Sequence, residues 1–163
     1  MLTETTLVLL KPDAVARGLA GRILQRFEDA GLKIAGVKMV LMDAELTARH
    51  YADLEKRFGA AVYAVTASFM QSGPVIALAL EGVGAVANTR RLIGTTFPDQ
   101  SAPGTIRGDY AHMSREYAEA HDLAVANLVH ASGSPSEAKY EIDLWFGEAG
   151  LHQYRAAADP FVR

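Results

Sequence analysis

NLVHASGSPSEAKYEI, residues 127–142, combines a short apolar run, a turn and a strong helix start. Residues 127–131 predict a strand. Ser134 to Glu137 then form a capping box, with proline at the first helical position. The helix that follows has an apolar stripe at helical spacing, made by Ala138, Ile142, Trp145 and Phe146. This strand-turn-helix unit fixes the turn in which His130 stands.

The same alternation of strand and helix signals extends back along the chain. TTLVLL (residues 5–10) and PVIALAL (74–80) are apolar on both faces, as buried strands are. KIAGVKMVLM (33–42) has an extended pattern. Helical spacing occurs over 19–30, where Gly31 follows as a C-terminal cap, and over 83–93.

A further helix is expected from Thr47, which can cap it, with Tyr51, Leu54 and Phe58 on one face. Residues 94–109 lack periodicity and are rich in Gly, Pro, Thr and Asp, which is typical of a binding loop. Residues 110–126 predict a polar, partly helical excursion. Interleaved strands and helices indicate an α/β (α+β) sandwich with a ferredoxin-like βαββαβ core, its antiparallel sheet covered by helices. We expect one domain over residues 1–163, with an extended segment at about 110–126.

Composition narrows the class of protein. Half of the residues are hydrophobic and 21% are charged, as in soluble globular domains. There are no cysteines, so disulfides and thiolate chemistry are excluded. The first residues lack a basic secretory leader and the apolar run ends at Lys11-Pro12, so we expect a cytoplasmic protein that does not insert in a membrane. A net charge of −3 argues against a nucleic-acid partner.

His130 is the first candidate for chemistry because it precedes a helix N-terminus, where free N–H groups favour an anion such as phosphate. Neutral imidazole is a nucleophile near pH 7. The competing interpretation is a partly buried structural histidine. Glu141 could hydrogen-bond the ring nitrogen that does not attack, or could be a solvated surface carboxylate. Lys11, Arg90 and Arg107 stand in or beside irregular stretches and could neutralise phosphate, although surface cations are common.

A metal site is the alternative use of the histidines. His112, His121 and His130 are spaced by nine residues, a spacing that fixes neither distance nor direction, so we expect no protein metal site. The sequence also has no G-x-x-x-x-G-K-[ST] phosphate loop.

Read together, several stretches resemble nucleoside diphosphate kinases in identity and order, over roughly Thr5 to Phe146. They are LVLLKPDAVARGLAGRILQRFEDAGLKI, SGPVIALALEG, PGTIRGD, NLVHAS and SPSEAKYEIDLWF. The resemblance implies that the γ-phosphate of a nucleoside triphosphate such as ATP or GTP passes to a nucleoside diphosphate. Transfer would be ping-pong through a phosphohistidine at His130, with Mg²⁺ bound mainly through the nucleotide phosphates. It also implies a homo-oligomer, a tetramer or a hexamer.

Residue roles follow from motif position. His130, Glu141, Tyr51 and Lys11 match the family's catalytic residues, with Glu141 orienting the histidine and Ser132 supporting that pair. The matching phosphate and nucleotide ligands are Lys11, Arg90, Thr96, Arg107 and Asn127, the last as the sugar-hydroxyl partner. Phe58 is the expected platform on which the base stacks.

The chain departs from the common pattern in three places. RFGAAVYAVTASFM (57–70) is longer than the segment that usually carries two adjacent phenylalanines. Gly133 replaces a frequent acidic residue near the nucleotide's Mg²⁺. Residues 110–126 resemble the longer archaeal form, and we expect them at the edge of the active site or at a subunit contact. The alternative function is a catalytically weak or inactive nucleotide-binding regulator.

Overall fold

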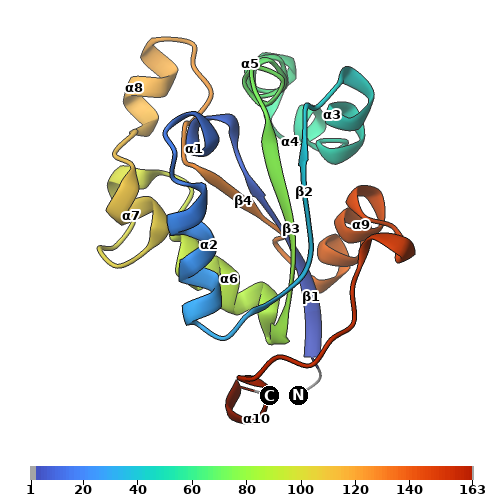
Figure 1. The fold of residues 1–163 in the computed structure, drawn as a ribbon. Helices are drawn as coiled ribbons and strands as arrows, with labels where there is room; N and C mark the ends of the chain where they lie inside the picture. The colour runs from blue at the N-terminus through green and yellow to red at the C-terminus, as the bar shows by residue number, and fades with distance from the viewer. Residues whose placement is uncertain (1–2, 163) are drawn as a thin grey trace.

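Four antiparallel strands form one sheet at the centre of the computed structural model, which describes residues 3–162 (Figure 1). The strands are β1 (Thr3–Leu10), β2 (Lys33–Val40), β3 (Val75–Val83) and β4 (Val129–Ala131). Their order across the sheet is β2-β3-β1-β4, so β1 pairs with both β3 and β4. This order, with helices in both crossovers, confirms the predicted ferredoxin-like fold.

Helices cover both faces of the sheet (Figure 1). The helices of the described residues are α1 (Pro12–Ala16), α2 (Ala20–Asp29), α3 (Ala44–His50), α4 (Leu54–Phe58), α5 (Ala60–Met70), α6 (Ala85–Ile93), α7 (Ile106–Tyr110), α8 (Arg115–Ala120), α9 (Pro135–Trp145) and α10 (Asp159–Val162). Short 3₁₀ turns lie at Pro98–Gln100 and Glu148–Gly150. Among these residues, no helix has the combination of length and apolar character that crossing a bilayer requires.

The apolar run of β1, residues 7–10, is explained by two separate cores. Val8 and Leu10 pack against α2, α6 and α7 on one face, whereas Leu7 and Leu9 pack against α5 and α9 on the other. All four side chains are fully buried, and burying each one contributes about 1.5–3 kcal/mol. The strand is therefore the shared wall of both cores.

Two local predictions were wrong. Asp43, not Thr47, caps α3, because its carboxylate accepts from Leu46 N at 2.7 Å; Thr47 lies inside the helix and donates to Asp43 O. The single helix expected through Phe58 is broken between His50 and Leu54 into α3 and α4. The irregular stretch 94–109 contains the start of α7, and the expected partly helical stretch 110–126 contains α8.

Candidate active site

The turn from β4 into α9 positions His130. Val129 and Ala131 are buried in the core beside α2 and α6, so the side chain between them points to the opposite face of the sheet. Leu128 has a φ of 70°, a left-handed conformation that is uncommon for a branched residue. Its N–H donates to Asp13 Oδ2 at 3.0 Å, and its carbonyl accepts from Lys11 N at 2.8 Å. The Lys11-Pro12-Asp13 turn thus holds the strand entry in place.

A buried carboxylate orients the His130 ring. Glu141, only 2% exposed, places Oε1 2.7 Å from Nε2 of His130. Its other oxygen accepts from Ser132 Oγ at 2.5 Å, and Ser132 Oγ itself accepts from Leu7 N at 3.2 Å. Glu141 is therefore no solvated surface carboxylate. Within residues 3–162 the second ring nitrogen of His130, Nδ1, has no hydrogen-bond partner, and the ring is partly exposed.

Two aromatic side chains, His50 and Tyr51, lie beside this pair. The ring centroid of His50 lies 4.7 Å from that of His130 and 4.6 Å from that of Tyr51, edge-on in both cases. Burial, with help from Glu141, raises the pKa of the Tyr51 phenol. Burial also holds the pKa of His50 well below its usual value, and His130 and Lys11 add to this effect. Tyr51 and His50 are thus uncharged near neutral pH.

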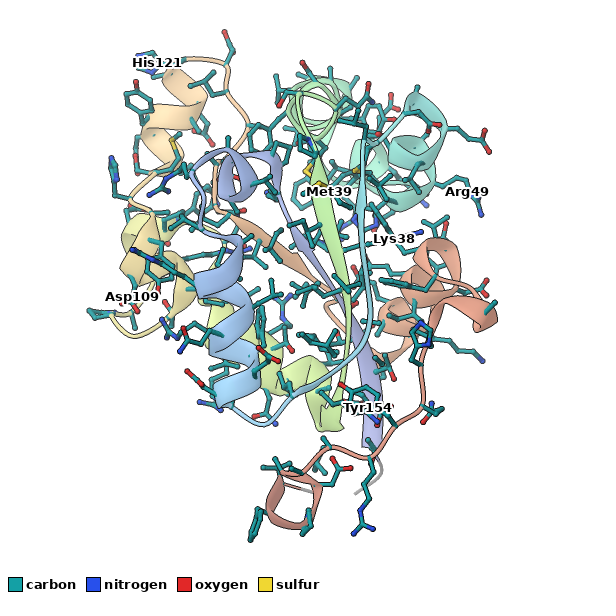
Figure 2. The ribbon with its side chains drawn as sticks, viewed as in Figure 1. Lys38, Met39, Arg49, Asp109, His121 and Tyr154 are labelled. Atoms are coloured by element: carbon teal, nitrogen blue, oxygen red, sulfur yellow. The ribbon has the colours of Figure 1, made fainter. Side chains whose placement is uncertain are left out.

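The described residues contain one group with the composition of a metal site: His50, His130 and Glu141, whose candidate ligand atoms lie within 4.8 Å of one another. Those atoms already bond within the protein: Nε2 of His130 bonds to Glu141, and Nδ1 of His50 accepts from Trp145 Nε1 at 3.3 Å. The group is better described as a hydrogen-bonded cluster. The three-histidine alternative is not formed, because His121 stacks on Tyr117 in α8, at the outer edge of the molecule (Figure 2).

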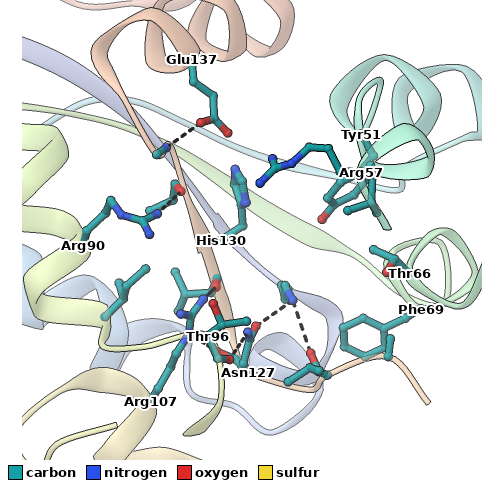
Figure 3. A pocket seen from close by; sticks show the side chains of 18 residues that line it. Tyr51, Arg57, Thr66, Phe69, Arg90, Thr96, Arg107, Asn127, His130 and Glu137 are labelled. Carbon is teal, nitrogen blue, oxygen red and sulfur yellow. Dashed lines mark hydrogen bonds between the residues drawn. The ribbon is translucent and has the colours of Figure 1, made fainter. Parts of the chain in front are cut away.

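A pocket of about 390 Å³ opens beside His130 (Figure 3). Four cations line it: Lys11, Arg57, Arg90 and Arg107. Glu137 is the one acidic side chain among its lining residues in the described chain, and it accepts from Gly133 N at 3.0 Å. Such a wall favours a polyanion.

A network of hydrogen bonds holds the floor of the pocket. Lys11 Nζ donates to Asn127 Oδ1 at 2.7 Å, and Asn127 Nδ2 donates to Thr96 O at 2.8 Å. Arg107 donates to the carbonyls of Gly94, Thr95, Asn127 and Val129, which uses four of its five N–H groups. The irregular stretch 94–109 is thereby fastened to β4.

Burial lowers the pKa of two cations in this floor. For Lys11 it falls to about 8, with Asp13 opposing and Arg107 adding to the shift. For Arg107 it falls to about 10, with Arg90 as the next cause. Both residues stay protonated at neutral pH, and a bound anion would offset the cost of burying their positive charges.

Most of the predicted site residues meet in this pocket. Its lining includes Lys11, Tyr51, Arg90, Thr96, Arg107, Asn127 and His130, and Glu141 stands behind the histidine. Phe58 is not part of the lining; its side chain is 56% exposed and lies under the Arg57 guanidinium.

Sequence reasoning missed Arg57, Thr66, Phe69 and Glu137, which also line the pocket. Arg57 and Phe69 belong to the stretch that departs from the family pattern, so no motif marked them. Glu137 was recognised only as a helix-capping residue. The extended segment 110–126 also contributes to the pocket, because Ala124 and Val125 line it.

Comparison with known proteins agrees with this geometry. The family model described as nucleoside diphosphate kinase matches residues 4–151. A nucleoside diphosphate kinase of Pyrococcus horikoshii is 44% identical over 162 residues, covering 99% of this chain and 96% of that protein. The chloroplastic nucleoside diphosphate kinase 2 of Spinacia oleracea is 43% identical over 98% of this chain, which spans 63% of that relative's length.

Solved structures give the same result. The Borrelia burgdorferi nucleoside-diphosphate kinase, a transition-state mimic with bound vanadate and ADP, has a TM-score of 0.94 at 36% identity, covering 98% of this chain and 96% of that one. The Halobacterium salinarum enzyme in complex with CDP has a TM-score of 0.87 at 37% identity, covering 99% of both chains. With its fold, His130 pocket and sequence all in agreement, the chain belongs to the nucleoside diphosphate kinase family.

Proposed function

We propose that this chain transfers the terminal phosphoryl group of a nucleoside triphosphate to a nucleoside diphosphate through a phosphohistidine at His130. One observation carries the proposal: Nε2 of His130 is held by Glu141, while Nδ1 has no partner in the described residues and the ring lines a pocket with four cations. A ring fixed in this way presents a lone pair where phosphate would bind.

The reaction balances in two steps. The Nδ1 lone pair of His130 attacks the γ-phosphorus, a P–N bond forms, and the bond to the bridging oxygen breaks with the nucleoside diphosphate as leaving group. In the return step a terminal phosphate oxygen of the acceptor attacks the same phosphorus, and the P–N bond breaks. Glu141 stabilises the positive charge on the ring while Nδ1 carries the phosphoryl group.

The pocket cations position the substrate. Lys11, Arg90 and Arg57 can contact phosphate oxygens, and Arg107 has one N–H left after its four carbonyl contacts. The Tyr51 hydroxyl is a neutral hydrogen-bonding group near His130. Thr96 and Asn127, joined to each other and to Lys11, place the sugar and phosphates.

Mg²⁺ fits this site only as part of the substrate. Among the described residues, the lining offers one carboxylate, Glu137, against four cations, so it has too few oxygen ligands to hold the ion by itself. Bound to the nucleotide, Mg²⁺ would neutralise phosphate charge, and Glu137 is the side chain that could approach it.

The base is proposed to lie against apolar residues of the pocket lining. These include Leu54, Phe69, Ala124 and Val125, and Phe69 is the aromatic one among them. This proposal replaces Phe58 by Phe69 as the stacking platform. Apolar walls and a π-face accept any base, which agrees with broad specificity for ATP, GTP and other nucleotides.

We also propose a homo-oligomer, with the tetramer or hexamer expected for the family. β2 is an edge strand of the sheet. Its residues Val37 and Met39, and Leu41 just after it, are 58%, 60% and 70% exposed. The C-terminal segment covers only the start of this edge, where His152 N donates to Ala35 O. An open strand edge with apolar side chains is suited to pairing with another copy.

A single domain and a cytoplasmic location remain predictions.

The proposed reaction is tested by incubating the protein with γ-³²P-ATP and Mg²⁺. We expect label that is acid-labile and alkali-stable, that requires His130, and that leaves as GTP when GDP is added. His130→Ala is the matched control and should bind nucleotide without becoming labelled. Nucleotide binding without label in the wild type would favour the inactive regulatory relative instead.

A further inference from the structure

His50 is a second buried histidine beside the proposed nucleophile, and it does not reach the pocket. It is 8% exposed and stands edge-on to His130 and to Trp145, with centroid distances of 4.7 and 5.7 Å. Its Nδ1 lies 3.6 Å from Oε1 of Glu141, the same oxygen that lies 2.7 Å from Nε2 of His130. Two imidazoles therefore face one carboxylate oxygen.

Trp145 determines which ring nitrogen of His50 carries the proton. The indole Nε1–H donates to Nδ1 of His50 at 3.3 Å. An indole N–H can only donate, so Nδ1 is the acceptor nitrogen in this contact. The proton of the neutral ring is then on Nε2, a buried atom with no hydrogen-bond partner in the described residues. In this tautomer Nδ1 of His50 has no proton to donate to Glu141, so of these two histidines His130 is the one that can donate to Oε1.

Once the indole is removed, the surrounding charges permit a proton on Nδ1 of His50. Glu141 faces His50 from α9 and favours its protonation, whereas His130 from β4 and Lys11 after β1 oppose it, and Tyr51 is neutral. Burial currently keeps the pKa of His50 low. His50 would not have to become charged to donate to Glu141. The proton of the neutral ring would only have to move from Nε2 to Nδ1.

We propose that Trp145 is a positioning residue of the phosphotransfer site: its indole N–H keeps Nδ1 of His50 an acceptor and so reserves Oε1 of Glu141 for His130. This inference rests on the proposed function for its catalytic consequence, but the tautomer of His50 does not depend on turnover.

The first test reads the tautomer directly. In protein labelled with ¹⁵N-histidine, two-bond ¹H–¹⁵N correlation spectra of the wild type should show His50 with its proton on Nε2 between pH 6 and 8. In Trp145→Phe the same spectra should show an Nδ1 proton. A wild-type His50 with an Nδ1 proton would overturn the inference, whether or not the protein is a kinase.

The second test measures turnover. Trp145→Phe keeps an aromatic ring but loses the donor. By analogy with the partners that orient metal-binding histidines, kcat should fall about tenfold, with little change in KM. Adding His50→Phe should restore most of that loss, because the competing donor is gone. Tyr140→Phe is the matched control, since it removes a hydrogen bond from α9 to Arg49 O without touching His50.

The double variant separates positioning from packing. If Trp145 serves only to fill the core, Trp145→Phe with His50→Phe will be as slow as Trp145→Phe or slower, and the inference is wrong. If Trp145→Phe does not fold, the wild-type spectra and the activity of His50→Phe alone still test the proposal. His50→Phe should then keep Glu141 bonded to His130, and loss of the His130 Nε2 proton signal would contradict the proposal.

Discussion

Oε1 of Glu141 lies 2.7 Å from Nε2 of His130, a contact that joins α9 to β4 across the turn between them. The capped start of α9 sets this distance, because the helix begins at Pro135 and brings Glu141 back under the strand. Both carboxylate oxygens are occupied, one by His130 and one by Ser132. The start of α9 therefore fixes the position of Glu141, and Glu141 fixes the orientation of the proposed nucleophile.

Glu141→Gln should lower kcat by about 10- to 100-fold, the range found when the partner that orients a metal-binding histidine is removed. KM should change little, because Glu141 does not line the pocket. Steady-state kinetics with varied ATP and a fixed acceptor measure both constants. Asp143→Asn, an exposed carboxylate on the same helix, is the control. An equal loss in both variants would mean that general damage to α9 is responsible.

Nucleotide affinity should weaken above about pH 8. The pKa of Lys11 is about 8 in the free protein, below its usual 10.5, because the ammonium group is buried. Below pH 8 Lys11 is charged and can bind phosphate. Above it, binding must take up a proton, so Kd for ADP should rise by up to about tenfold per pH unit. Lys11→Arg should remove this dependence in calorimetric titrations, and an unchanged slope would exclude Lys11 as its source.

Arg57→Ala should weaken nucleotide binding although no motif marked this residue. Figure 3 shows its side chain extending into the pocket toward His130, and it also pairs with Asp53 at 3.1 Å. An exposed ionic contact contributes up to about 1 kcal/mol, or roughly fivefold in Kd. Arg91→Ala is the matched control, because Arg91 is exposed and outside the pocket lining. Similar effects of both substitutions would point to net charge alone.

Phe69→Ala should raise Kd for nucleoside diphosphates by about fivefold, since stacking contributes about 1–3 kcal/mol per base and this pocket is open to solvent. Phe58→Ala should have little effect, because Phe58 is exposed and outside the lining. Affinity for inorganic pyrophosphate, which has no base, should be the same in all three proteins. The reverse ranking of the two variants would restore Phe58 as the platform.

Met39→Asp should dissociate the oligomer, because it places a charge in the apolar edge of β2, where Met39 is 60% exposed. Sedimentation velocity measures the assembly directly. Leu123→Asp, an exposed apolar residue of the extra segment, serves as the comparison. Dissociation by Leu123→Asp alone would move the proposed interface from β2 to that segment.

Much of this protein was readable from its sequence because the decisive signals are local. Two apolar faces on residues 7–10 predict a strand between two cores, and Ser134 to Glu137 predict the start of α9. The motifs around Lys11, Arg107, Asn127 and His130 predict one site, which the structure assembles in one pocket. Short-range hydrogen bonding and hydrophobic periodicity determine such features, so the order of residues contains them.

Other features depend on contacts between distant segments. Three features follow from how α3, α4 and α5 pack beside β4: the 3.6 Å approach of His50 Nδ1 to Glu141 Oε1, the absence of Phe58 from the pocket lining and the presence of Phe69 in it. A periodic apolar stripe indicates the buried face of a helix, but α5 (AAVYAVTASFM) is apolar nearly all round and has no such stripe. No sequence pattern gives the distance between two rings from separate elements. Sequence therefore determined the fold and indicated His130 as the proposed nucleophile. Tertiary packing decided which neighbours surround it, because burial and distance arise only when the elements meet.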